Sequence, residues 1–203
     1  MIRIILGGEW RGNQDSWNCL KEFMQYHSAD VYVATPNLKE WRLPFSFYSV
    51  NANLLEDTIF NQSTHPHKER YIGQWSSLHI AYKYFNNMYK FADDDIVVKL
   101  RNDLVYKPFE LEAEKGTIYT PKKEYHSPIP FPSDLLCNDQ IIYGYNSVMR
   151  KYFNLPYDYV YTDRNPIAIK HYGDVLGIEE TLRNYLYQQD IKLKTFNLNY
   201  TKV

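Results

Sequence analysis

The chain has 203 residues and a formal net charge of −1, with 44% apolar and 23% charged residues. These values are ordinary for a folded domain, and the length suits a single domain with a core of its own. Without a basic excess, a nucleic-acid partner is not expected. Two cysteines, Cys19 and Cys137, make neither a disulfide framework nor a zinc-ligand spacing. No apolar run reaches the length of a membrane span, and residues 1–10 lack a signal-peptide pattern, so we expect a cytoplasmic protein.

The first elements alternate between strand and helix. We predict a buried strand over 2–6, a loop over 7–15, a helix capped by Ser16 and a second strand over 30–35. A β–α–β opening of this kind is typical of a parallel sheet with helices on its faces. No G-x-G-x-x-G and no P-loop follow the first strand, so a dinucleotide cofactor is not expected.

The rest of the chain is less regular. Residues 37–69 show no periodicity, and His65 and His67 within them lack the partners of a zinc site. The later elements predicted are a helix over 70–91, strands over 95–100 and 116–121, a turn, strand and helix within 138–153, a helix over 178–190 and a strand over 191–200. The fold class expected is therefore α/β, with a Rossmann-like N-terminal half and a mixed central sheet flanked by helices.

Aspartates stand at both ends of the strand predicted over 95–100. Asp93, Asp94 and Asp95 precede the strand, and Asp103 follows it. Eight residues of extended chain span roughly 26 Å, so the two sets cannot share one cation. Ligands of open α/β sheets bind beyond the carboxyl ends of the strands, which favours Asp103 as the functional carboxylate. We interpret Asp93 to Asp95 as a solvated turn, in which Asp95 can bond to the backbone.

Arg101 stands two residues before Asp103, so the two side chains can point the same way. Two interpretations of Arg101 stay open, because it can bind a phosphate or simply pair with the acid. A hard cation at Asp103 would take its other oxygens from substrate phosphates.

The run from Asp95 to Leu104, with Arg101 and Asp103, resembles the Y-D-x-V-x-x-x-R-x-D-L segment of small GT-A-type glycosyltransferases. These include capsid-glycosylating enzymes of large algal DNA viruses and WavE-like enzymes of bacterial surface polysaccharides. The resemblance implies that Asp103 holds Mn²⁺ or Mg²⁺ against a nucleotide-sugar diphosphate. It also implies glycoprotein biosynthesis in a viral setting, which would be the host cytoplasm.

Four further segments resemble family motifs in the same order along the chain: residues 6–11 a G-x-x-R turn, residues 74–78 a Q-x-x-S-L helix start, residues 138–144 an N-D-Q-x-x-x-G segment, and residues 177–182 a P-E-x-L-L helix start. Two positions depart from the usual pattern, since Ile178 and Asn102 stand where proline is common. Neither departure removes a ligand.

Individual residues then receive expected roles. The nucleotide-sugar contacts are assigned to Gly7, Gly8, Arg11, Thr35, Asn37, Gln74, Ser77, Arg101 and Asp103. The glycines would admit a ligand close to the backbone, Arg11 would bind phosphate or base, and Thr35 and Asn37 would read a uracil or ribose. Gln74 and Ser77 share a helix face and would meet the sugar hydroxyls. For many of them a plain structural role remains the alternative.

Asp139 is the predicted general base, since an inverting transfer needs a carboxylate that accepts the proton of the acceptor hydroxyl. An Asx turn is the alternative for Asp139, and a retaining enzyme would not need this base.

The sequence thus predicts one domain over 1–203, with a nucleotide-sugar half at about 1–104 and an acceptor half at about 105–203. The predicted activity is metal-dependent transfer from a nucleotide diphosphate sugar, first of all a UDP-sugar, to a glycan or glycoprotein hydroxyl. A sugar-phosphate nucleotidyltransferase and a non-catalytic carbohydrate-binding or assembly module are the alternatives.

Overall fold

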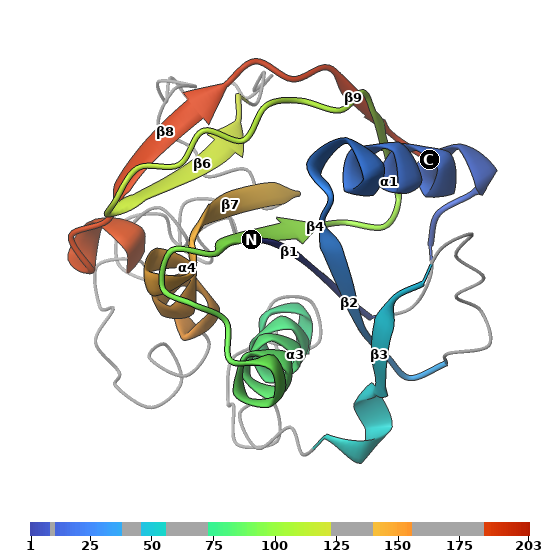
Figure 1. Ribbon diagram of the computed structural model, residues 1–203, viewed down its shortest axis with the longest axis horizontal. Helices are drawn as coiled ribbons and strands as arrows, with labels where there is room; N and C mark the ends of the chain where they lie inside the picture. Colours follow the sequence, from blue (N-terminus) through green and yellow to red (C-terminus); the bar gives the residue numbers. More distant parts are fainter. Residues whose placement is uncertain (9–10, 38–45, 56–72, 123–139, 156–184) are drawn as a thin grey trace, which may run out of the picture.

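The computed structural model describes residues 1–8, 11–37, 46–55, 73–122, 140–155 and 185–203. A seven-stranded sheet forms its centre, in the order β3-β2-β1-β4-β7-β6-β8 (Figure 1). Its strands are β1 (Ile2–Gly7), β2 (Asp30–Thr35), β3 (Tyr48–Asn51), β4 (Ile96–Leu100), β6 (Thr117–Pro121), β7 (Ile141–Tyr145) and β8 (Lys192–Phe196). Strands β5 (Leu104–Tyr106) and β9 (Tyr200–Lys202) form a second, two-stranded sheet.

The sheet is mixed, as predicted. Strands β1, β2, β3 and β4 are parallel to one another, whereas β7 runs antiparallel to both β4 and β6. Strand β8 is again parallel to β6. The carboxyl ends of β1 to β4 therefore lie at one edge of the sheet, together with the amino end of β7.

Helices cover the two faces of the sheet. Helix α1 (Gln14–His27) packs on one face, where Leu20 and Phe23 join Ile4, Val31 and other residues that alternate along the strands. Helices α3 (Gly73–Tyr89) and α4 (Asn146–Phe153) cover the other face, in a core built on Ile5, Val97 and their neighbours. Figure 1 shows α1 on one side of β1 and β4, and α3 on the other.

The strand order reverses at β1. Strand β2 pairs with one side of β1, and β4 pairs with the other side. After β1 the chain therefore builds the sheet outward through β2, and it later returns to add β4 on the opposite side of β1. The first connection carries α1 on one face and the element before β4 is α3 on the other face. Such a reversal leaves a crevice at the carboxyl ends of the two central strands, where α/β proteins bind ligands.

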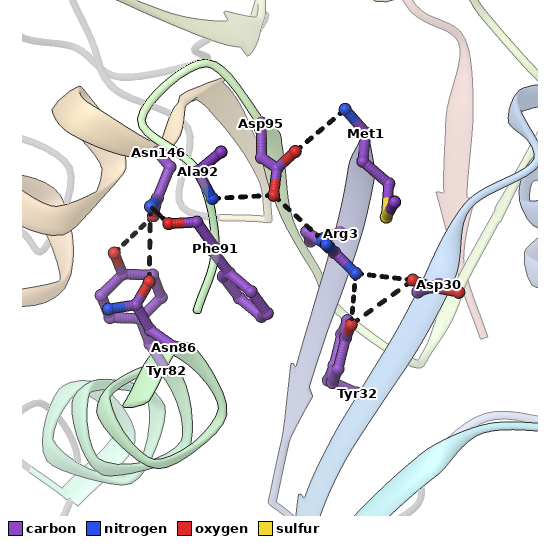
Figure 2. Close-up of polar contacts among 10 residues, drawn as sticks. All are labelled: Met1, Arg3, Asp30, Tyr32, Tyr82, Asn86, Phe91, Ala92, Asp95 and Asn146. Atoms are coloured by element: carbon purple, nitrogen blue, oxygen red, sulfur yellow. Dashed lines mark hydrogen bonds and ion pairs between the residues drawn. The ribbon is translucent and has the colours of Figure 1, made fainter. Parts of the chain in front are cut away.

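The amino ends of the same strands are tied by charge. The Arg3 guanidinium donates to Asp30 (2.6 Å), to the Tyr32 hydroxyl (2.7 Å) and to Asp95 (3.2 Å) (Figure 2). Asp95 also accepts from the Ala92 amide at 3.0 Å and pairs with the Met1 ammonium at 2.9 Å. Asp95 is thus bonded to backbone, as predicted, but it is only 5% exposed. Asp93 and Asp94 are exposed in a turn, as predicted, whereas the buried ion pairs of Asp95 correct the prediction of a solvated turn for that residue.

Three local predictions need correction, and one strand, β5, was not predicted. Helix α1 is capped by Asn13, whose side chain accepts from Asp15 and Ser16, while Ser16 lies inside the first turn. The segment predicted as irregular contains β3, and β5 follows the Asp103 turn directly. The last predicted strand, 191–200, divides into β8 and β9, which belong to different sheets.

Candidate functional site

The carboxyl end of β1 turns sharply at two glycines. Gly8 has φ +87°, which side-chain-bearing residues rarely adopt, and its amide donates to Ala34 O at 3.0 Å. Gly7 lies against α3, because a Cβ at this position would stand 3.1 Å from Leu78 Cδ2. The two glycines therefore allow β1 to end between β2 and α3, with open space beside Gly8.

The carboxyl end of β2 is ordered by its own turn. Thr35 is fully buried, and its hydroxyl accepts from the Asn37 amide at 3.3 Å. Asn37 is exposed at the same edge. Thr35 thus has a structural task, whereas Asn37 is an exposed residue just after the carboxyl end of β2.

The carboxyl end of β4 carries the Arg101–Asp103 pair. Arg101 Nε lies 2.9 Å from Asp103 Oδ1, and Arg101 Nη2 lies 2.7 Å from Oδ2, a two-pronged contact. The Asp103 side chain is 3% exposed and that of Arg101 20%. Of the two interpretations of Arg101, the structure shows the ion pair.

A third charged residue, Lys202 of β9, reaches the same carboxylate. Lys202 Nζ lies 3.8 Å from Asp103 Oδ2, and the Val203 amide donates to Asp103 O at 3.0 Å. Burial alone would raise the pKa of the Asp103 carboxyl, but the bonds and charge of Arg101, with the charge of Lys202, hold this pKa below its usual range. Asp103 is therefore a carboxylate at neutral pH.

Other predicted residues lie along the same edge. The Arg11 amide lies 3.4 Å from Asn102 Oδ1, so the loop after β1 meets the loop after β4. Ser77 is half-buried on α3, next to Leu78. Gln74 lies in the first turn of α3, whereas Asp139 lies outside the described residues. Its neighbour Gln140 accepts from the Arg101 amide at 3.1 Å, where β7 begins beside the end of β4.

The structure thus places Gly7, Gly8, Arg11, Thr35, Asn37, Arg101 and Asp103 at or just after the carboxyl ends of β1, β2 and β4, and Ser77 near the start of α3. Sequence reasoning missed Lys202, because nothing in the local sequence links the last strand to Asp103. It also passed over Lys99 in the middle of β4, which is 1% exposed. Lysine is rarely buried, so a lysine inside an otherwise apolar strand could have identified Lys99 as unusual from the sequence.

No protein-family model matches the sequence, and no curated protein matches it either. Solved structures do match. A glycosyltransferase involved in the glycosylation of the major capsid of PBCV-1 superimposes with a TM-score of 0.50 and 11% identity, over 97% of this chain and 83% of that chain. Its arrangement of strands and helices agrees with the mixed, helix-flanked sheet described above.

The fold is GT-A-like. The predicted fold class is therefore confirmed, as is the resemblance in fold to a capsid-glycosylating enzyme.

Two further structures are similar at lower scores. GlyE of Streptococcus pneumoniae has a TM-score of 0.44 and 11% identity, over 94% of this chain and 44% of that chain. Galactosyltransferase LgtC has a TM-score of 0.47 and 13% identity, over 95% of this chain and 73% of that chain. The chain spans less than half the length of GlyE.

The GT-A-like fold and the position of Asp103 together raise the question of a divalent cation. Such a cation needs several oxygen ligands, and both Asp103 oxygens already accept hydrogen bonds from Arg101. Within the part of the chain that the structure describes, no three His, Cys, Asp or Glu side chains gather as a metal site would require. As arranged here, the described residues do not fit a metal ion.

The described helices also bear on membrane association. None of them combines the length and the apolar character that crossing a bilayer would require.

Proposed function

We propose that the protein is a glycosyltransferase that moves a sugar from a nucleotide diphosphate sugar to a hydroxyl of a glycan or glycoprotein. A UDP-sugar is the first candidate donor. The observation that carries the proposal is the charged Arg101–Asp103 pair at the reversal point of a GT-A-like sheet, beside the Gly8 turn. Ligands of α/β sheets bind at this position.

The transfer forms a bond between the acceptor oxygen and the anomeric carbon and breaks the bond to the diphosphate. The leaving diphosphate gains negative charge, which fixed cations at the site stabilise. The acceptor hydroxyl loses its proton to a base, and Asp139 stays the predicted base for an inverting reaction. Gln140, the next residue along the chain, lies beside Arg101, which supports Asp139 as the candidate.

The two halves keep their proposed tasks. Residues 1–104 contain the strands whose carboxyl ends form the edge described above, and they would hold most of the nucleotide sugar. Residues 105–203 would bind the acceptor. Asn37, Gln74 and Ser77 are the proposed contacts for the nucleoside and the donor sugar.

The proposal is tested by calorimetric titration of UDP into the wild-type protein, once with EDTA and once with Mn²⁺. Saturable binding of UDP is expected in at least one of the two conditions. In a second assay, a panel of UDP-sugars is incubated with the protein, and slow hydrolysis of one of them is expected. The prediction of Mn²⁺ or Mg²⁺ at Asp103 stays a prediction, and the pair of titrations decides it.

Absence of UDP binding in both conditions would contradict the UDP proposal. Binding of a nucleoside triphosphate together with a sugar phosphate would then indicate a nucleotidyltransferase. Binding of glycans without any nucleotide would indicate a carbohydrate-binding module.

A further inference from the structure

Asp103 gathers two cations from distant parts of the chain. Arg101 holds both carboxylate oxygens, and Lys202 Nζ lies 3.8 Å from one of them. The three side chains differ in access to solvent: Asp103 is 3% exposed, Arg101 20% and Lys202 57%. The negative charge is therefore inside, and the positive charges lie between it and the solvent.

The charge of this cluster suits an anion. One carboxylate and two cations leave a net charge of +1, and the carboxylate fixes the guanidinium in place. A fixed guanidinium binds phosphate oxygens in a fork, and an ammonium adds a point charge beside it. Arg11, which is exposed, belongs to the loop whose amide approaches Asn102. The turn after β1 thus carries another cationic residue, whose backbone lies next to the loop of Arg101 and Asp103.

Strand β9 fixes Lys202 at this place. Leu104 of β5 pairs with Lys202, and the Val203 amide donates to Asp103 O. Backbone pairing at Asp103 and Leu104 therefore fixes the main chain of Lys202 beside Asp103.

We propose that Arg101 and Lys202, held by Asp103, bind the diphosphate of the donor in the place that a divalent cation would take. Asp103 is then a positioning residue and not a metal ligand. The inference rests on the proposed function and deepens it, because it names the groups that neutralise the leaving diphosphate.

The experiment compares UDP and inorganic diphosphate as titrants in EDTA and in Mn²⁺. For the wild type, binding of both titrants in EDTA is expected, with little change on adding Mn²⁺. Lys202→Ala should weaken UDP binding in EDTA about tenfold, the loss of one charge-assisted phosphate contact. Lys202→Arg should retain most of the affinity.

Lys192→Ala is the matched control. Lys192 is an exposed strand lysine opposite Thr117, at the other edge of the sheet, and its loss should leave the UDP affinity unchanged. Because Lys202 is more than half exposed, its replacement should not prevent folding, and circular dichroism checks this.

Two results would overturn the cation-pair proposal while leaving the glycosyltransferase proposal intact: UDP binding that requires Mn²⁺, or equal UDP affinity for Lys202→Ala and the wild type. In another outcome, inorganic diphosphate binds and depends on Lys202, but UDP does not bind. This result would contradict UDP-sugar as the donor and support the binding of diphosphate by Arg101 and Lys202. Failure of both titrants would contradict both proposals.

Discussion

Single residues at the carboxyl edge combine structural tasks with positions suited to a ligand. Gly8 is the clearest example. Its φ of +87° is a backbone conformation that is strained for any L residue with a side chain, although nothing lies within 4 Å of a Cβ placed there. A substitution at Gly8 therefore acts through the backbone of the turn and not through a clash. Gly116, with φ +72° and equally open space, lies at the opposite edge, before β6.

We expect Gly8→Ala to lower the free energy of unfolding by about 1 kcal/mol, the cost of a left-handed backbone. Gly116→Ala should cost a similar amount. Only Gly8→Ala should also weaken UDP binding, since only that turn lies beside Arg101 and Asp103. Urea unfolding and calorimetry measure the two effects, and equal UDP affinities for both variants would contradict a ligand role for this turn.

The ends of the Asp95–Asp103 run show what the sequence could predict about single residues. The predicted strand placed Asp103 at its carboxyl end and Asp93 to Asp95 at its amino end, as the structure does. The bond between Asp95 and the backbone was also predicted. The partners were not predictable, because Arg3 reaches Asp95, and Lys202 reaches Asp103, only through strand pairing. The same sequence left the roles of Arg101 open, since an arginine near an acid pairs with it or with a phosphate equally well.

At the scale of elements, Asn146 at the start of α4 joins three parts of the chain. The Asn146 amide donates to Asp95 O at 2.7 Å, and its side-chain Nδ2 donates to Phe91 O at 3.0 Å and Asn86 Oδ1 at 3.3 Å. Its Oδ1 accepts from the Tyr82 hydroxyl at 2.5 Å. Figure 2 shows this group beside the Asp95 network. Asn146 thereby connects α3, α4 and the turn that enters β4.

We expect Asn146→Ala to lower the free energy of unfolding by about 3 kcal/mol, because buried polar groups of Tyr82 and Phe91 lose a partner. Burial raises the pKa of Tyr82 to about 12, so this hydroxyl stays a donor at neutral pH. Asn87→Ala, an exposed replacement on the same helix as Tyr82, should change stability by less than about 0.5 kcal/mol. Equal effects of the two substitutions in urea unfolding would refute the role given to Asn146.

The elements that the sequence predicted well are those with strong apolar patterns. The observed bounds differ from the predicted ones by at most one residue for β1, β2, β4 and β6. For helix α3 the difference is three residues at the start and two at the end. Strand β3 was missed because Tyr-Ser-Val-Asn is short, half-exposed and at the sheet edge. The cap of α1 was misplaced because Asn13 and Ser16 are both good capping residues, and they form a capping box together.

At the scale of the whole molecule, the two edges of the sheet carry different sets of polar residues. The amino edge is fixed by the Arg3, Asp30 and Asp95 network, which joins β1, β2 and the start of β4. The carboxyl edge gathers the residues proposed for the donor. The parallel pairing that places the carboxyl ends of β1 and β2 at one edge was predictable from the β–α–β opening. The antiparallel position of β7 and the second sheet were not, because both depend on long-range pairing.

The amino-edge network predicts how stability depends on pH. Burial alone would raise the pKa of Asp95, but bonds from the Met1 ammonium, the Ala92 amide and Arg3 hold this pKa below its ordinary value. The stabilisation is then complete above the unfolded-state pKa near 4 and is lost as the pH falls through the lower folded-state pKa. We expect Asp95→Asn to cost about 3 kcal/mol at pH 7.

Urea unfolding of the wild type and Asp95→Asn between pH 7 and pH 3 tests this expectation. The difference between them should shrink below pH 4, as the carboxyl of the unfolded wild-type chain gains its proton. Asp94→Asn, at an exposed neighbour, serves as the control. A difference that stays constant down to pH 3 would show that the ion pairs of Asp95 do not stabilise the fold.

The pairing of β5 with β9 has a consequence for how the protein is made. Lys202 meets Asp103 only after β9 has paired beside β5, and such long-range closures are slow steps in folding. On the ribosome, β1 to β4 can associate while β9 has not yet been synthesised. The emerging chain would thus pass through a stage with its Rossmann-like half assembled and Lys202 still missing from the Asp103 cluster.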